Sequence, residues 1–153
     1  MLTCCTDFIL PLIECFNYRF LTELNRARSY TGSYLCDHSL PLDWYRFSGA
    51  AGNQMADSCV GSYRCGTWRT GWLNGSHPSF ADGAVQRRVC FCYSSSSCCR
   101  YSTYISVRNC GGFYIYQLTP VTICYLRYCG NGIVPPLPVA PGRNSSHLAH
   151  NAS

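Results

Sequence analysis

Thirteen cysteines in a chain of 153 residues constrain this fold more than any other feature of the sequence. This density, about one residue in twelve, is typical of small extracellular domains whose disulfides form in an oxidising compartment. Zinc binding is the main alternative, but the sequence has no Cys-x-x-Cys pair. Cys124 and Cys129 come nearest to such a pair, and no second pair or nearby histidine accompanies them. We therefore predict disulfides, a secreted protein, and neither a metal site nor another cofactor.

The net charge of +5 comes entirely from arginine, since the sequence contains no lysine. The arginines are scattered, and only Arg87 and Arg88 are adjacent. Nucleic-acid-binding surfaces usually cluster their positive charge, so this pattern argues against a nucleic-acid partner. No apolar run approaches the length of a membrane span.

Composition divides the chain into three parts. Residues 1–14 contain an apolar stretch, Phe8 to Ile13, that is too short for a signal-peptide core and follows no basic residue, so we interpret this part as a truncated or degenerate signal region. The last cysteine is Cys129, which predicts a folded unit over residues 15–131. Residues 132–153 are rich in proline and then polar, which predicts an extended, disordered tail.

Alternating apolar and polar residues predict strands in the folded unit. The clearest alternation is followed by Cys110-Gly111-Gly112, where two glycines tolerate the positive φ angles of a tight turn. The expected strands are residues 17–21, 44–47, 85–93, 104–109, 113–118 and 121–128, with weak helical character over 21–28. The predicted fold class is mainly β: a small, disulfide-rich antiparallel β domain with long loops and little helix.

The order of several motifs is similar to that of the cysteine-rich domain of the uromodulin family. The motifs are Cys36-Asp37, Trp44-Tyr45-Arg46-Phe47, Cys59-Val60, Cys65-Gly66-Thr67, Trp72-Leu73-Asn74-Gly75-Ser76-His77-Pro78, Arg88-Val89-Cys90, Cys98-Cys99, Cys110-Gly111-Gly112-Phe113 and the segment from Cys124 to Cys129. The resemblance covers about residues 15–129. Because so many motifs occur in one order, we identify the domain as similar to this family.

The resemblance implies which cysteines form bridges. Ten occupy the family's positions: Cys15, Cys36, Cys59, Cys65, Cys90, Cys98, Cys99, Cys110, Cys124 and Cys129. They are enough for five bridges, whose connectivity the sequence leaves open. The adjacent Cys98 and Cys99 point in different directions and are expected to tether two separate segments. Cys92, Cys4 and Cys5 are left over as candidates for a free thiol or an intermolecular link, which would produce a disulfide-linked oligomer.

Three Asn-x-Ser/Thr sequons predict N-glycosylation of an exported chain, at Asn74, Asn144 and Asn151. Members of the family display a mannose-rich glycan that bacterial pilus adhesins bind, so the resemblance implies microbial adhesins among the partners. The family's second sequon is missing, because this chain has Gln117 before Leu118-Thr119.

An enzyme is not predicted. The sequence lacks a Gly-x-Ser-x-Gly nucleophile motif, its carboxylates show no paired spacing, and His38 and His77 are isolated. Trp68 and Trp72, in a glycine-containing segment beside the first sequon, are the candidates for an exposed contact patch. The predicted function is a non-catalytic extracellular module for glycan display or for recognition of a protein or glycan ligand. The alternative is a structural or assembly module of a larger secreted or matrix protein.

Overall fold

A computed structural model describes residues 10–139 and 141–142. In this part of the chain the strands are β1 (Arg19–Leu21), β2 (Asp43–Phe47), β3 (Arg69–Asn74), β4 (Ala84–Phe91), β5 (Tyr101–Asn109), β6 (Tyr114–Leu118) and β7 (Leu126–Tyr128). The helices are short 3₁₀ segments: η1 (Leu10–Phe16), η2 (Leu24–Arg26), η3 (Gly49–Ala51) and η4 (Phe80–Asp82). Among these described residues, no helix has the length and apolar character needed to cross a bilayer.

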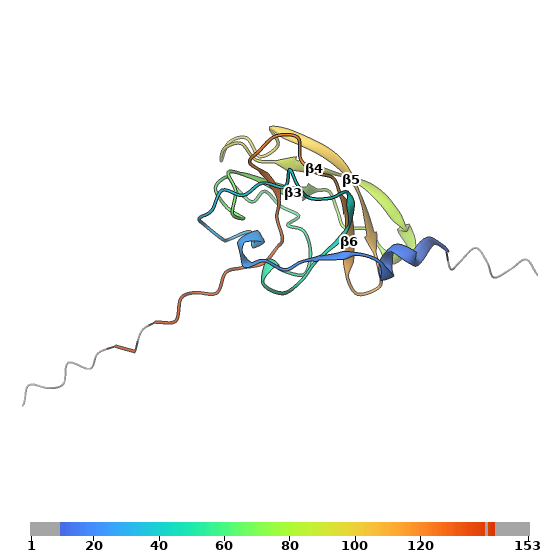
Figure 1. Cartoon of the computed structure of the whole chain (residues 1–153), viewed down its shortest axis with the longest axis horizontal. Coiled ribbons are helices and arrows are strands. Elements are labelled where there is room, and N and C mark those ends of the chain that lie inside the picture. Colours follow the sequence, from blue (N-terminus) through green and yellow to red (C-terminus); the bar gives the residue numbers. More distant parts are fainter. Residues whose placement is uncertain (1–9, 140, 143–153) are drawn as a thin grey trace, which may run out of the picture.

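The strands form one curled sheet in the order β1-β2-β6-β5-β4-β3-β7 (Figure 1). The five central strands pair antiparallel, whereas β1 on β2 and β7 on β3 are parallel pairs at the two edges. The mainly β class with little helix is confirmed. The parallel edges were not predicted. Parallel neighbours need a long connection, and each edge strand is joined to its partner through extended irregular or intervening segments.

The β5–β6 hairpin forms where the alternation predicts it. Asn109 lies opposite Tyr114, and the backbone N–H of Cys110 donates to the carbonyl of Phe113 at 2.8 Å. Gly111 and Gly112 have φ angles of +83° and +155°, which side chains rarely tolerate. Local sequence therefore specifies this hairpin.

The predicted strand over residues 121–128 is wrong in its length and its partner. Only the last three residues form β7, and β7 pairs with β3 instead of returning beside β6. Pro120 has no backbone N–H for a ladder, and the N–H of Val121 donates to the carbonyl of Asp37 at 3.2 Å. The chain therefore leaves the sheet before β7 begins.

The helical character expected over residues 21–28 is also limited. Leu21 belongs to β1, and only η2 is helical, as a single 3₁₀ turn. Pairing of β1 with β2 and burial of Leu21 in the core take precedence over the weak local preference.

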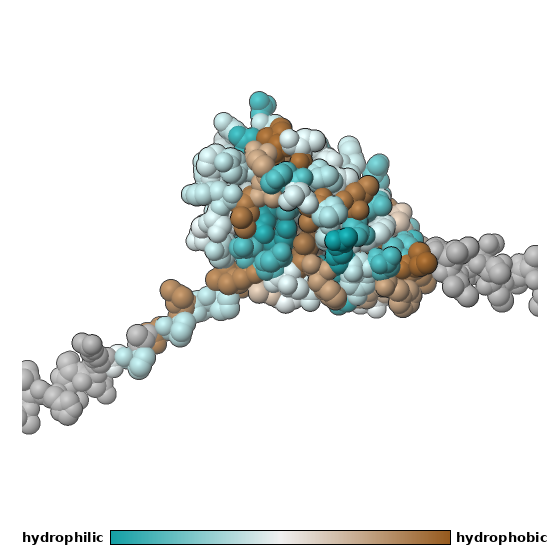
Figure 2. All heavy atoms as spheres, in the orientation of Figure 1, coloured by the Kyte–Doolittle hydropathy of each residue, from teal (hydrophilic) through white to brown (hydrophobic). Residues whose placement is uncertain are grey.

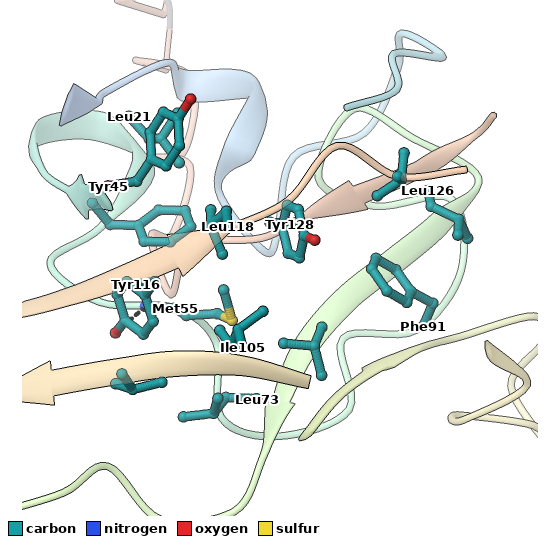
Figure 3. Close-up of a cluster of buried hydrophobic side chains, with 14 of the residues drawn as sticks. Leu21, Tyr45, Met55, Leu73, Phe91, Ile105, Tyr116, Leu118, Leu126 and Tyr128 are labelled. Carbon is teal, nitrogen blue, oxygen red and sulfur yellow. Dashed lines mark hydrogen bonds between the residues drawn. The ribbon is translucent and has the colours of Figure 1, made fainter. Parts of the chain in front are cut away.

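One hydrophobic core receives side chains from all seven strands (Figure 3). Tyr116 is fully buried there, and its hydroxyl accepts a hydrogen bond from the backbone N–H of Met55 at 2.9 Å. Because every strand contributes to this single cluster, the sheet wraps around its own core. The inner face is thereby occupied, which leaves loops and strand ends as the available surface.

Five disulfides connect the ten family-position cysteines: Cys15–Cys110, Cys36–Cys124, Cys59–Cys98, Cys65–Cys129 and Cys90–Cys99. The adjacent Cys98 and Cys99 are divided between two bridges to two segments. Cys92 is buried, and it is the unbridged cysteine within the described part of the chain. Cys4 and Cys5 lie outside the described residues.

The domain limits at residues 15–131 and the tail over 132–153 stay predictions. The described residues after β7 run away from the sheet (Figure 1). They keep backbone contacts at first, since the N–H of Gly132 donates to Ala51 and that of Val134 to the Ser29 hydroxyl.

Candidate functional site

Exposed aromatic side chains gather where β3 and β7 begin. The parallel register places Arg69 beside Leu126, so the preceding residues, Trp68 and Tyr125, are neighbours. Their ring centroids are 4.2 Å apart with an interplanar angle of 34°. The backbone N–H of Arg69 donates to the Tyr125 carbonyl at 3.1 Å. The edge pairing of the sheet thus creates an aromatic stack at the surface.

Two loops bring further rings to this stack. The N–H of Tyr63 donates to the carbonyl of Trp68 at 3.1 Å, and the N–H of Leu35 donates to Gly66 at 2.7 Å. These bonds place Tyr63 and Tyr34 with ring centroids 6.4 and 5.3 Å from that of Trp68. The Cys65–Cys129 bridge fixes the loop between them to the end of β7.

Solvent exposure separates these rings from the core. The exposed fractions are 61% for Tyr63, 59% for Tyr34, 38% for Trp68 and 37% for Tyr125, and nearby Tyr93 is 52% exposed. We name these five residues the aromatic surface. Large rings left accessible at this level are candidates for ligand contacts, because aromatic residues are enriched in binding interfaces.

Two grooves share Tyr63 as a common wall. The first has a volume of about 540 Å³ and the second about 440 Å³. The first is lined by Ser62, Tyr63, Trp68, Arg69, Tyr93, Ser94 and Ser95, and the second by Thr31, Gly32, Ser33, Tyr34, Ser62, Tyr63 and Arg64. Both therefore combine aromatic faces with hydroxyl groups and one arginine.

The arginines give the grooves a positive character. Arg69 donates to the Tyr101 hydroxyl at 3.1 Å, and its guanidinium carbon lies 4.8 Å from the ring centroid of Tyr93. No carboxylate lines either groove, and neither Arg64 nor Arg69 forms an ion pair within the described residues. Figure 2 shows hydrophilic and hydrophobic residues interspersed on the visible face of the domain. The grooves suit a ligand with apolar faces and negative charge.

Trp72 does not belong to the aromatic surface, which corrects the predicted Trp68–Trp72 patch. It lies in β3 instead of a loop, is half-buried, and packs against Ala56, Cys65 and Cys129. Its indole N–H donates to the Cys98 carbonyl at 2.9 Å. Trp72 therefore has a packing role, and sequence analysis missed Tyr34, Tyr63, Tyr93 and Tyr125.

The Asn74 sequon occupies an accessible turn. Asn74 is the last residue of β3 and is exposed, and Gly75 follows with a φ of +147°. An exposed asparagine at the end of a strand is sterically open to a glycan. The other sequon asparagines, Asn144 and Asn151, lie outside the described residues.

The titratable groups considered for catalysis have structural partners. Asp37 forms a buried ion pair with Arg26, and Asp43 pairs with Arg19. His77 Nε2 lies 2.8 Å from the hydroxyl of Tyr116, and burial lowers the pKa of this histidine. These contacts account for the side chains without a substrate.

Two clusters of potential metal ligands contain disulfide sulfurs. They are Cys36, His38 and Cys124, and Cys59, Cys92 and Cys98. Because Cys36–Cys124 and Cys59–Cys98 are bridged, their sulfurs are not the thiolates that zinc requires.

Residues 45–130 match the family model of the uromodulin-like cysteine-rich domain, which covers more than half of the chain. The chain belongs to the uromodulin-like domain family. Mouse uromodulin is 49% identical over 116 residues, covering 75% of this chain and 18% of that protein. The canine pancreatic secretory granule membrane major glycoprotein GP2 is 43% identical over 117 residues, or 75% of this chain and 23% of that protein, and the human GP2 is 39% identical.

Membership of the uromodulin-like family confirms the resemblance identified from the motif order. The relatives and the disulfide-rich fold agree with an extracellular location for this chain. The chain spans less than a quarter of the length of these relatives. Its own ligand therefore has to be inferred from its surface.

Proposed function

We propose that this uromodulin-like domain is a non-catalytic extracellular recognition module whose ligand binds at the aromatic surface. The observation that carries the proposal is the convergence of five exposed rings from four separate segments around two grooves. Rings that serve only for packing would be buried, as Tyr116 and Tyr128 are. Rigid, exposed aromatic faces contribute contact area at a small entropic cost.

The chemistry of the grooves favours an acidic carbohydrate over a neutral one. Sugar rings present apolar faces that stack on Trp68 and Tyr63, and their hydroxyls match the serine and threonine hydroxyls of the lining. Arg64 and Arg69 supply positive charge without a competing carboxylate. Carboxylate or sulfate groups on the sugar would pair with these guanidinium groups.

A glycan array carrying neutral, sialylated and sulfated oligosaccharides tests this proposal with the full chain. We expect binding to the acidic sugars that weakens as salt concentration rises. Tyr63→Ala should reduce affinity about fivefold, corresponding to roughly 1 kcal/mol for a stacked ring. Tyr104→Ala is the matched control, because Tyr104 is equally exposed at 61% but lies on β5 outside the grooves. Equal losses in both variants, or no binding of acidic sugars, would contradict the proposal.

Glycan display at Asn74 is a second candidate function, favoured by the exposure of this asparagine in its turn. The two functions are separable. Asn74→Gln should abolish enzymatic release of an N-glycan from the described domain and leave the array binding unchanged. If display is the function, enzymatic deglycosylation should also remove binding of bacteria that carry mannose-specific pili. Unchanged bacterial binding after complete deglycosylation would exclude this second function.

A further inference from the structure

The unbridged Cys92 is in contact with a disulfide. Its side chain is fully buried, with 0% exposure, and its Sγ lies 3.3 Å from the Sγ of Cys59. Cys59 is bridged to Cys98. All three sulfurs lie within 4.8 Å of one another. A thiol and a disulfide are the two reactants of thiol–disulfide exchange, and this fold holds them together.

We propose that these three cysteines exchange partners, so that the free thiol moves from the buried Cys92 to Cys98, which becomes a site of covalent modification. In the exchange, the thiolate of Cys92 attacks Sγ of Cys59. The Cys59–Cys92 bond forms, the Cys59–Cys98 bond breaks, and Cys98 leaves as a thiolate that takes up the proton lost by Cys92. One disulfide and one thiol are present before and after, so the step needs no oxidant.

The movement required is small. The two sulfurs must approach by about 1.3 Å from their separation of 3.3 Å to reach the length of a disulfide bond. Cys92 directly follows β4, and Cys98 belongs to the connection between β4 and β5. Either pairing thus links the loop that carries Cys59 to the same part of the sheet.

Other contacts hold this region in place when the bridge changes. The adjacent Cys99 stays bridged to Cys90 in β4. The carbonyl of Cys98 accepts from the indole N–H of Trp72 at 2.9 Å. The backbone N–H of Cys92 donates to Thr70 at 3.1 Å. Because these contacts do not involve the exchanging sulfurs, the fold accommodates both pairings.

The exchange changes the accessibility of the thiol. A reagent in solution cannot reach the 0%-exposed Cys92, whereas Cys98 is half-buried and follows the exposed Ser95 and Ser96. The liberated Cys98 thiolate can attack an external disulfide, forming a mixed disulfide and releasing one thiol of that compound. The external disulfide is the oxidant in this second step. It is either a small-molecule disulfide or a disulfide of a second copy of this chain.

Oxidised glutathione is the probe that tests the proposal. The test uses the full chain with Cys4→Ser and Cys5→Ser, so that no thiol outside the described residues reacts. After incubation under native conditions, non-reducing peptide mapping by mass spectrometry should find one glutathione on Cys98 and a Cys59–Cys92 bridge. Adding Cys92→Ser should abolish the modification. Glutathione on Cys92, or an unmodified chain with an intact Cys59–Cys98 bridge, would overturn the proposal.

A second variant tests the alternative bridge directly and does not depend on an external reagent. Cys98→Ser in the same background should fold with a Cys59–Cys92 bridge and no reactive thiol. Two free thiols at Cys59 and Cys92 would overturn the proposal. Non-reducing electrophoresis then distinguishes the sources of the external disulfide: a covalent dimer that Cys92→Ser removes indicates a second copy, and a monomer carrying glutathione indicates the small molecule.

Discussion

Arg26 and Asp37 form a buried ion pair with two parallel hydrogen bonds, of 2.7 and 2.9 Å. Their side chains are 5% and 4% exposed. The same Asp37 carboxylate accepts the backbone N–H of Tyr128 at 2.9 Å, and Arg26 donates to the Tyr128 carbonyl at 3.0 Å. The pair therefore joins η2 and the loop before β2 to the edge strand β7.

Removing one partner of this pair should destabilise the fold strongly. Asp37→Asn leaves the Arg26 guanidinium buried without its counter-charge, so we expect a loss of about 3–5 kcal/mol in the free energy of unfolding. Asp43→Asn is the matched control: the Arg19–Asp43 pair is exposed, with side-chain exposures of 59% and 34%, and should contribute less than about 1 kcal/mol. Urea denaturation measures both. Similar losses in the two variants would show that burial does not set the strength of these pairs.

Stability should fall in mildly acidic solution because of His77. Burial lowers the pKa of His77 below its ordinary value of 6.5, so the unfolded chain binds this proton more readily than the folded chain. The contribution to stability is complete above pH 6.5 and decreases as pH falls from there toward the folded pKa. One proton changes the free energy of unfolding by at most about 1.4 kcal/mol per pH unit.

Urea denaturation between pH 7.5 and pH 5.5 isolates this effect, since most carboxylates titrate below that range. His77→Gln should show a smaller decrease than the parent chain, because glutamine does not titrate. An equal decrease in both proteins would assign the pH dependence to other groups.

Gly130 should not tolerate a side chain. A Cβ at this position would overlap the carbonyl of Ala51 and come within 2.9 Å of the Phe47 ring. Gly130→Ala should therefore cost about 1–3 kcal/mol through overpacking, which thermal unfolding would detect as a lower midpoint. The control is Gly142→Ala, where the added Cβ meets no atom within 4 Å. A parent-like midpoint for Gly130→Ala would mean that the surrounding backbone yields.

A single change should test whether β6 can carry the sequon found elsewhere in the family. Gln117→Asn completes an Asn-x-Thr sequon with Leu118 and Thr119, on a half-buried position between Trp44 and Ser106 of the neighbouring strands. Expression in a glycosylating host should add one glycan, seen as a glycosidase-sensitive mobility shift. The double variant Gln117→Asn, Thr119→Ala is the control that lacks a sequon. A shift in the double variant would show that the added glycan is not at residue 117.

Local patterns of the sequence predicted part of this fold. The β5–β6 hairpin follows from short-range alternation and two glycines, and the ten bridged positions follow from motif order. The pairing of β7 with β3 is different, because it joins residues such as Arg69 and Leu126 that are far apart in the chain and carry no local signal for parallel pairing. The connectivity of the disulfides depends on the same long-range contacts.

The aromatic surface shows the same limit. Trp68 was recognisable as a ring in a glycine-containing segment, but Tyr34 and Tyr125 lie in separate segments with no shared motif. Trp72 was placed in the wrong environment because the burial of β3 between β4 and β7 is a property of the sheet and not of its local residues.

The parallel pairing at the β7 edge gives ligand binding a dependence on synthesis order. Trp68 is made well before Tyr125, and their stack cannot form until the final strand has docked and Cys129 has reached Cys65. A chain halted inside the oxidising compartment before that point would present isolated rings and no complete groove. Occupancy of the grooves would thus report that the last strand is in place, which makes the ligand itself a probe of maturation.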